Sequence, residues 1–192
     1  MLKEKLSNYN IILASGSPRR QQFFKDLHIP FTIEIKEVEE VFPPTLKGVE
    51  ITDYLANLKA KPFNHLLDND LLITSDTIVW LNEEALGKPK DAEEAFKMLR
   101  KLSGKQHQVL TSISIKNPNF QVVTNDTTVV YFKELTDEEI NYYIKTCQPF
   151  DKAGAYGIQE WIGFIGIDRL EGSYFNVMGL PVHKLYKELM KL

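Results

Sequence analysis

A short loop near the N-terminus has the residues of a phosphate-binding site. The apolar run 11–14 leads into Ser15–Ser17, and Arg19 and Arg20 follow at once. Backbone N–H groups of such a loop, together with the start of a helix, attract anions. Arginine guanidinium groups bind phosphate oxygens bidentately. The Gly-Lys-Ser/Thr ending of a Walker A loop is absent, and an ordinary capped helix with solvated arginines has the same pattern.

Asp76 stands out because it interrupts the apolar run 71–81, within Ser75-Asp76-Thr77. A buried, unpaired carboxylate is unfavourable, so we expect Asp76 at a strand end, hydrogen-bonded, or bound to a cation. A carboxylate in such a place holds a divalent metal or acts as a general base. The alternative is a structural aspartate that caps a nearby turn.

Further charged side chains have the right chemistry for a phosphorylated ligand. The acidic stretch Glu37–Glu40 could add a metal-binding oxygen from Glu37, Glu39 or Glu40, although a solvated edge is the commoner role of such a cluster. Lys59 lies in a predicted helix and Lys88 in Gly87-Lys88-Pro89. Each could pair with a phosphate, or be a solvated surface charge.

The segment 151–159 is rich in small residues, which allow a backbone to approach a ligand closely. Gln159 at its end offers both a donor and an acceptor to the edge of a base. A flexible connecting loop is the other interpretation.

These residues must be positioned by a mixture of strands and helices. The patterns predict strands over 11–14, 31–35, 71–81, 108–115, 121–132 and 164–167, and helices over 18–27, 52–67, 91–103, 136–147 and 180–192. Ser17, Asp91 and Thr136 are predicted N-caps, and Pro62 is predicted to kink or end its helix. No linker or repeat divides the chain, so the sequence predicts one α/β domain over residues 1–192.

Composition narrows the class of protein. With 192 residues, 43% of them hydrophobic, the chain is long enough for a sizeable core. A net charge of −3 argues against binding a long nucleic acid, and no apolar run approaches the length of a membrane span. A single cysteine, Cys147, excludes an intramolecular disulfide, and no secretory apolar segment opens the chain, so we expect a cytoplasmic protein. The four histidines lack the spacing of a zinc site.

Several motifs in order resemble the Maf family of nucleoside triphosphate pyrophosphatases, also called septum formation proteins. The resemblance runs from Ile11 to about Leu185. The motifs that carry it are 13–20 (Leu-Ala-Ser-Gly-Ser-Pro-Arg-Arg), 75–77 (Ser-Asp-Thr), 87–89 (Gly-Lys-Pro), 99–104 (Leu-Arg-Lys-Leu-Ser-Gly), 151–159 and 177–181 (Val-Met-Gly-Leu-Pro).

The resemblance implies an α/β Maf/ITPase-like fold, with a mixed curved sheet, flanking helices and a deep cleft between two lobes. It implies hydrolysis between the α- and β-phosphates, assisted by a divalent cation such as Mg²⁺ or Mn²⁺, and a homodimer is plausible on the same basis. Carried over by position, Asp76 is the proton acceptor. The residues that would face the triphosphate include Ser15, Ser17, Arg20, Lys59 and Lys88. Glu40, with Asp76, would bind metal or water.

Substrate choice in this family follows three positions, which here are Arg19, Thr77 and Gln159. They resemble the subgroup that acts on dTTP and UTP, because a neutral Gln159 suits uracil or thymine whereas a glutamate suits a cationic methylated purine. Glu160 and Trp161 depart from the family, which commonly has a small residue and then a basic one. Two alternatives stay open: a broader or 7-methyl-GTP-type specificity, and a non-catalytic nucleotide-binding regulator.

Overall fold

The computed structural model describes all residues, 1–192, as an α/β protein. Its elements in chain order are α1 (Leu2–Lys5), β1 (Asn10–Leu13), α2 (Pro18–Asp26), β2 (Thr32–Ile33), α3 (Val49–Ala60), β3 (Asp70–Leu81), β4 (Glu84–Leu86), α4 (Ala92–Leu102), β5 (Gln106–Lys116), β6 (Gln121–Phe132), α5 (Asp137–Cys147), η1 (Pro149–Asp151), η2 (Ala153–Ala155), α6 (Trp161–Gly166), β7 (Ile167–Glu171), α7 (Tyr174–Val177) and α8 (Val182–Leu189). Each helix is either too short or too polar to span a lipid bilayer.

The strands form one seven-stranded mixed sheet with the order β2-β1-β3-β5-β6-β7, and β4 pairs with β3. β1 runs parallel to both β2 and β3, whereas the β3–β4 and β6–β7 pairs are antiparallel. The predicted class, α/β with a mixed sheet and flanking helices, is confirmed. The deep cleft stays a prediction of the family resemblance.

Contacts group the chain into two compact units, each built from separate stretches of sequence. Unit 1 contains Met1–Asp76, Thr111–Asp126 and Gly179–Leu192, and unit 2 contains Thr77–Leu110 and Thr127–Met178. The long strands β3, β5 and β6 contribute residues to both. The expectation of one domain over residues 1–192 stays a prediction.

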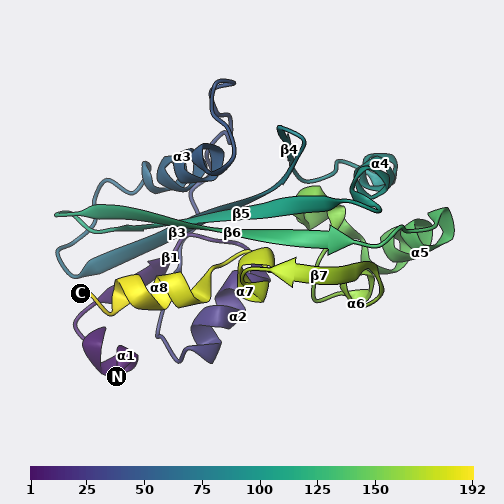
Figure 1. Cartoon of the computed structure of the whole chain (residues 1–192). Helices are drawn as coiled ribbons and strands as arrows, with labels where there is room; N and C mark the ends of the chain where they lie inside the picture. The colour runs from purple at the N-terminus through teal and green to yellow at the C-terminus, as the bar shows by residue number, and fades with distance from the viewer. The chain divides into compact units, whose positions relative to one another are not determined.

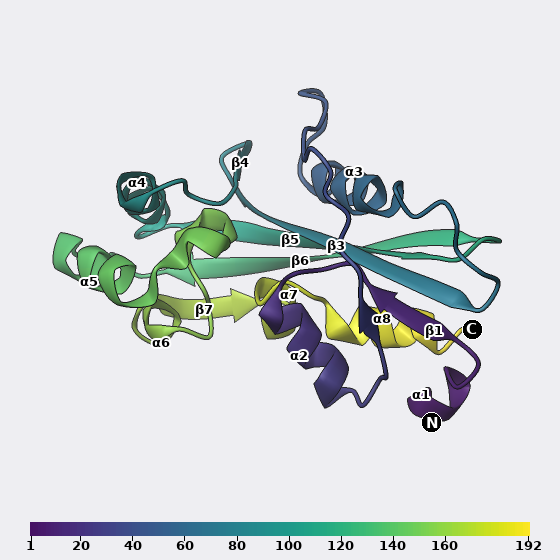
Figure 2. The ribbon, with the colours of Figure 1, turned by 180° about the vertical axis from the view of Figure 1, so that it is seen from behind.

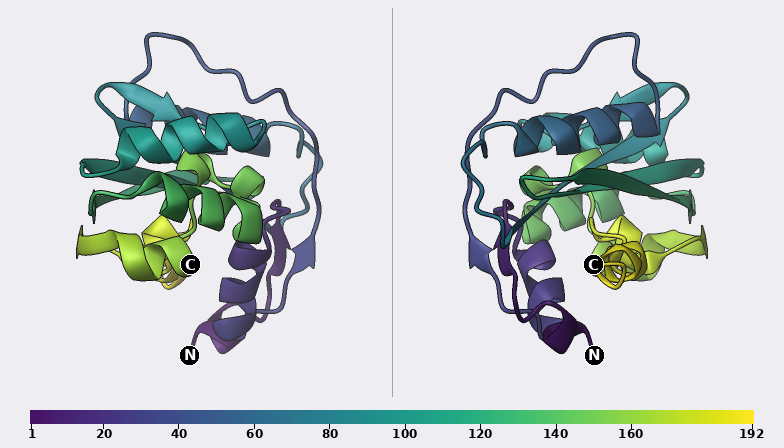
Figure 3. Two further views of the ribbon diagram at one scale, coloured as in Figure 1. Left: turned by 90° about the vertical axis from the view of Figure 1, so that its right-hand side faces the viewer. Right: turned by 90° about the vertical axis from the view of Figure 1, so that its left-hand side faces the viewer.

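In unit 1, α3 lies on one face of the strands, and α2 and α8 lie on the opposite face (Figure 1). Apolar side chains fill the space beneath α3, where Ala60 and Phe63 pack on Ile12 of β1 and Leu72 of β3. Segment 34–48 has no regular structure and arches from β2 to the start of α3 (Figure 3).

In unit 2, α4 and α6 lie on opposite sides of the strands (Figure 2). Its core includes Val79, Leu99, Val130 and Ile162. Burial of such side chains is worth roughly 1.5–3 kcal/mol each, so these strands and helices stabilise one another.

The predicted N-caps of three helices are confirmed. Ser17 caps α2 with Pro18 in its first turn, and the Asp91 carboxylate accepts from the Glu94 N–H at 2.8 Å at the start of α4. Thr136 and Glu139 form the predicted reciprocal capping box of α5, which ends at Cys147. These interactions are made within one turn of chain, which is why sequence reveals them.

Two predicted elements differ in the structure. The helix predicted over 52–67 is α3, which runs over Val49–Ala60, so the prediction that Pro62 ends its helix is confirmed, since proline has no N–H with which to continue the helical hydrogen bonds. Phe164 belongs to α6 and not to a strand, and the neighbouring strand, β7, begins at Ile167. A short apolar run has no periodicity that separates a helical turn from a strand.

Smaller differences concern lengths and short elements. The strand predicted over 31–35 shrinks to the two residues of β2, and the closing helix occupies only Val182–Leu189 of the predicted 180–192. The short elements α1, β4 and α7 had no sequence signal that we recognised.

Candidate active site

Asp76 lies in the middle of β3, and its side chain contacts a cation. It is only 6% exposed. The Nζ atom of Lys59, on α3, lies 2.6 Å from Asp76 Oδ1 and 3.1 Å from Glu40 Oε2. Of the three environments predicted for a carboxylate in this apolar run, the structure contains two, because Lys59 both donates a hydrogen bond to Asp76 and is its cationic partner.

The topology explains why Asp76 lies near the Ser15–Ser17 loop. β1 pairs in parallel with β3 up to Leu13 opposite Ile73, and the Ala14 N–H still donates to Ile73 at 2.9 Å. The chain then leaves β1 for the loop and α2, while β3 continues through Ser75 to Asp76. Ligands of α/β proteins bind at such carboxyl ends of parallel strands.

Arg20 joins three parts of unit 1. Its Nε donates to the Gly179 carbonyl and its Nη1 to the Ser75 carbonyl, each at 2.8 Å. Burial lowers the pKa of the guanidinium to about 10, while the nearby Asp76 carboxylate acts in the opposite direction. Arg20 therefore remains a cation at neutral pH and lies beside the strand segment that carries Asp76.

The loop itself is ordered by short-range hydrogen bonds. The Ser17 N–H donates to Ser15 Oγ at 3.3 Å, and Gln21 Nε2 donates to the Ser15 carbonyl at 3.2 Å. Ser15 is buried, and the hydroxyl of Ser75 is buried without a hydrogen-bond partner. Arg19 follows on the first turn of α2 and is half-buried.

The donor set at Asp76 suits a metal that is bound mainly through its substrate. The structure has no group of three or more acidic, histidine or cysteine side chains that could hold a metal ion by themselves. Asp76 and Glu40 offer carboxylate oxygens on either side of Lys59. Mg²⁺ is usually held by one or two carboxylates plus substrate phosphates and water, and these two residues fit that pattern.

The remaining predicted site residues lie in unit 2. Thr77 opens the unit on β3 and is half-buried. Lys88 is exposed in the turn before α4, and the carbonyl of the preceding Gly87 accepts from the Gly154 N–H at 2.9 Å. This hydrogen bond joins two motifs that are far apart in sequence, the Gly-Lys-Pro turn and the segment 151–159.

Segment 151–159 is largely buried, so the flexible-loop interpretation is wrong. Gly154 adopts a φ of +67°, and a Cβ at this position would lie 2.7 Å from Val79 Cγ2. The Tyr156 hydroxyl lies 2.7 Å from Nε2 of the buried His107. Burial lowers the pKa of His107 to about 3 and raises that of Tyr156, so both side chains are neutral at physiological pH.

Gln159, at the end of this segment, is half-buried, and its Oε1 atom is buried without a hydrogen-bond partner. The next two residues, Glu160 and Trp161, which depart from the usual family pattern, both have partners in the structure. Lys152 and Tyr143 both contact the Glu160 carboxylate, and the Trp161 ring packs against Tyr142 with centroids 4.8 Å apart.

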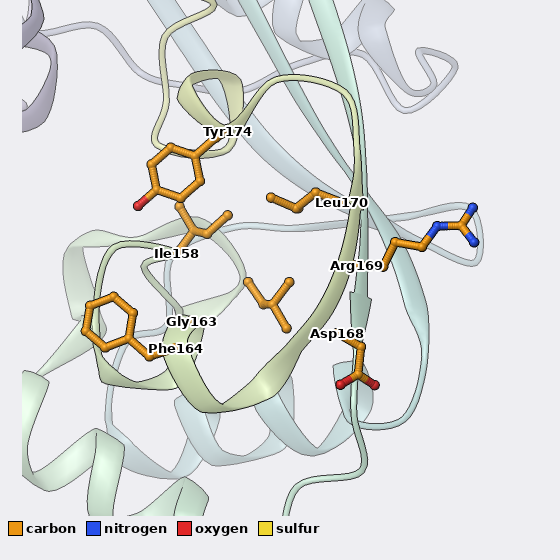
Figure 4. Close-up of a pocket in the computed structure, with 8 residues that line it drawn as sticks. Ile158, Gly163, Phe164, Asp168, Arg169, Leu170 and Tyr174 are labelled. Carbon is orange, nitrogen blue, oxygen red and sulfur yellow. The ribbon is translucent and has the colours of Figure 1, made fainter.

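An open pocket of about 320 Å³ lies elsewhere in unit 2, beside β7 and α6 (Figure 4). Ile158, Leu170 and Tyr174 line it, while Arg169 points away. None of the predicted site residues lines it, so its position gives no support for a role in the chemistry.

The structure thus brings Asp76, Lys59, Glu40 and Arg20 together in unit 1 and ties the Lys88 turn to the Gln159 segment in unit 2. Sequence analysis missed the two carbonyl groups that hold Arg20. It also missed Lys152 and Tyr143, the partners of Glu160. Gly179 lies in the motif 177–181, but its contact with Arg20 is made by the backbone carbonyl, which every residue has, so the sequence could not reveal it.

Comparison with known proteins identifies the family. A family model described as Maf-like protein matches residues 10–192. The chain belongs to the Maf family. Relatives named dTTP/UTP pyrophosphatase match it over essentially its full length. The one from Flavobacterium johnsoniae is 58% identical over 100% of this chain and 100% of its own. The one from Flavobacterium psychrophilum is also 58% identical, over 99% of this chain and 98% of its own. One from Phocaeicola vulgatus is 51% identical over 98% of this chain and 99% of its own.

Solved structures show that the fold of this Maf protein is shared more widely. A HAM1 protein from Coxiella burnetii superposes with a TM-score of 0.54 at 16% identity, covering 96% of this chain and 100% of its own. The Ham1 protein of Staphylococcus aureus gives 0.50 at 21% identity, covering 93% and 99%. At such low identity the likeness concerns the fold alone.

Proposed function

We propose that this Maf protein hydrolyses dTTP and UTP between the α- and β-phosphates, releasing the nucleoside monophosphate and pyrophosphate. The observation that carries the proposal is the buried Asp76 carboxylate, in contact with Lys59 and beside Arg20. The relatives named dTTP/UTP pyrophosphatase, up to 58% identical over the full length, support the same activity. Removal of such triphosphates from nucleotide pools is the corresponding cellular role.

In the proposed reaction, a water oxygen attacks the α-phosphorus, the bond to the bridging oxygen breaks, and pyrophosphate leaves with that oxygen. Asp76 accepts the proton of the attacking water. Cationic side chains offset the charge that builds up on the phosphoryl oxygens and on pyrophosphate, and we assign this role to Arg20, Lys59 and Lys88. Ser15 and Ser17 orient the phosphates through the loop and the N-terminus of α2.

Asp76 and Glu40 would hold a divalent cation, Mg²⁺ or Mn²⁺, together with the phosphates. Bound there, the cation would supply Lewis-acid charge neutralisation at the phosphoryl oxygens. Lys59, which contacts both carboxylates, would then be shared between them and the substrate.

Base selection is proposed to depend on Arg19, Thr77 and Gln159. The Gln159 amide is neutral and combines an acceptor with a donor. It matches the N3–H and the carbonyl oxygens of uracil and thymine, whereas a 7-methylated guanine, which is cationic, would favour a carboxylate. A cytoplasmic location, a homodimer and an effect on septum formation are further proposals that follow from the family.

A substrate panel tests the function. The full-length protein with Mg²⁺ or Mn²⁺ is given dTTP, UTP, CTP, GTP and 7-methyl-GTP, and the products are identified. We expect monophosphate and pyrophosphate, with dTTP and UTP preferred. Preference for 7-methyl-GTP would contradict the base assignment, diphosphate with phosphate would contradict the bond cleaved, and tight binding without turnover would favour a regulator.

A further inference from the structure

The segment that ends in Gln159 rests on a partly buried cluster of polar groups in unit 2. We call Lys152, Glu160, Tyr143 and the Gly157 N–H the Glu160 cluster. Lys152 is 7% exposed, and its Nζ lies 2.9 Å from Glu160 Oε1 and 2.6 Å from Asp151 Oδ1. The Tyr143 hydroxyl donates to Glu160 Oε2 and accepts from the Gly157 N–H at 3.0 Å.

These contacts hold the segment before Gln159 at several points. Lys152 lies near the start of this segment and Glu160 directly follows Gln159, and the two are joined by their ion pair. The Glu160 N–H also donates to the Gly157 carbonyl at 3.0 Å. Both polar groups of the Gly157 backbone are thus bound within the cluster or by Glu160, so the turn before Gln159 has little freedom to move.

The Glu160 carboxyl and the Gln159 amide lie against the same small residue. A Cβ added to Gly157 would lie 2.9 Å from Glu160 Cδ and 3.0 Å from Gln159 Nε2. Since Gln159 Oε1 has no hydrogen-bond partner, no bond to that oxygen orients the amide. The position of the backbone that carries Gln159 therefore limits where the amide can reach.

Charge compensation explains how an acid is tolerated here. Lys152 and Tyr143 each bind one carboxylate oxygen of Glu160, so neither oxygen is buried without a partner. Burial, reinforced by the bond to Glu160, raises the pKa of Tyr143, so its hydroxyl keeps its proton and remains a donor. Both oxygens of the Glu160 carboxylate are therefore engaged beside Gln159, one by Lys152, which it shares with Asp151, and one by Tyr143.

From this geometry we propose that Glu160 is a positioning residue for base selection: anchored by Lys152 and Tyr143, it holds the turn that aims the Gln159 amide at uracil or thymine. The proposal rests on the proposed function. It assigns to Glu160, Tyr143 and Lys152 a role in recognising the base and none in cleaving the anhydride.

Two conservative substitutions separate this role from general stability. Tyr143→Phe removes the hydroxyl that links Glu160 to Gly157, and Glu160→Gln removes the charge that pairs with Lys152. The matched controls are Tyr142→Phe, on the neighbouring exposed tyrosine, and Glu138→Gln, on an exposed carboxylate of α5. Gln159→Ala provides the reference for loss of the base contact.

The readouts are KM and kcat for dTTP, UTP and CTP, and the inhibition constant of inorganic triphosphate, which has no base. We expect both variants to raise KM for dTTP and UTP about tenfold, as the loss of one hydrogen bond to a charged or buried group would. We also expect their preference for UTP over CTP, measured as the ratio of kcat/KM, to fall, and we expect the same fall in Gln159→Ala. The kcat values and the inhibition by inorganic triphosphate should stay near those of the wild type and the controls.

The wild-type protein allows a test that does not depend on a variant folding. A UTP analogue with a non-cleavable α,β-methylene bridge should slow amide hydrogen exchange over residues 157–160, whereas inorganic triphosphate should not. Equal protection by both ligands would overturn the positioning role. Unchanged KM and base preference in the folded variants, or equal weakening of nucleotide and inorganic triphosphate, would overturn it as well.

Failure of the proposed function looks different. If the wild-type protein releases pyrophosphate from no nucleoside triphosphate, the function and this inference fail together. If it hydrolyses dTTP and UTP but the variants behave as the controls do, only the role of the Glu160 cluster is wrong.

Discussion

The Lys59 ammonium contacts the Asp76 carboxylate at 2.6 Å, and its other ion pair, with Glu40, is 3.1 Å long. The two acids are 36 residues apart in sequence, on β3 and in segment 34–48, yet they share one cation. The contact gives a buried carboxylate a cationic partner, and a carboxylate in such a place can accept a proton from water.

Asp76→Asn should abolish most of the turnover and leave a folded protein. An amide cannot accept the proton of the attacking water, so we expect kcat for dTTP to fall by roughly 10²–10⁴-fold. Pyrophosphate release measures the rate, and circular dichroism checks the fold. Asp68→Asn, at an exposed aspartate of the same unit, is the control. An Asp76→Asn protein with wild-type turnover would remove Asp76 from the mechanism.

Arg20→Lys should destabilise the protein despite keeping the charge. The guanidinium donates from Nε and Nη1 to two carbonyl groups, and a lysine ammonium does not reproduce that fork. Losing one of these bonds to a buried carbonyl should lower the free energy of unfolding by about 1–3 kcal/mol, measured in urea. Arg169→Lys, at a side chain 63% exposed, is the control and should change little. Equal stability of the two variants would show that the carbonyl contacts of Arg20 contribute nothing.

His107 should make stability depend on pH. Its pKa is about 3 in the folded protein against an ordinary value of 6.5, so as the pH falls below 6.5 the unfolded chain binds a proton that the folded chain does not. The contribution of neutral His107 is therefore complete above pH 6.5 and is lost as the pH falls toward 3, by up to about 1.4 kcal/mol per pH unit.

The comparison is with His107→Gln, which can keep a hydrogen bond to Tyr156. Between pH 7 and pH 5 the stability advantage of the wild type over this variant should shrink by about 2 kcal/mol in urea unfolding. The same comparison with His65→Gln, at an exposed histidine, should show almost no change. A pH-independent difference for His107→Gln would mean that His107 titrates normally in the folded state.

Gly154→Ala should destabilise unit 2, because φ is +67° there and the added methyl would lie 2.7 Å from Val79 Cγ2. Backbone strain and overpacking together should cost about 2–4 kcal/mol. Gly87→Ala is the matched control, since nothing lies within 4 Å of its added Cβ. The midpoints of thermal unfolding of the two variants are compared. A Gly154→Ala protein as stable as Gly87→Ala would show that the segment accommodates the added methyl group without strain.

Features made within a turn or two of chain were predictable from sequence. The caps of α2, α4 and α5 depend on side chains that bind backbone three residues away. Asp76 was predictable as a site because a carboxylate in an apolar strand needs a partner. Which partner it has was not predictable, because Lys59 meets it only after α3 packs on the sheet.

Sequence alone determined the main helices and strands, the family and the residue types that a triphosphate site needs, because capping, apolar periodicity and motif order are properties of the chain itself. Only the tertiary structure decided that Lys59 joins Asp76 to Glu40, that Arg20 donates to the carbonyls of Ser75 and Gly179, and that Lys152 and Tyr143 bind the Glu160 carboxylate. Such contacts depend on the positions of distant segments and on backbone groups that every residue carries, so no local pattern encodes them.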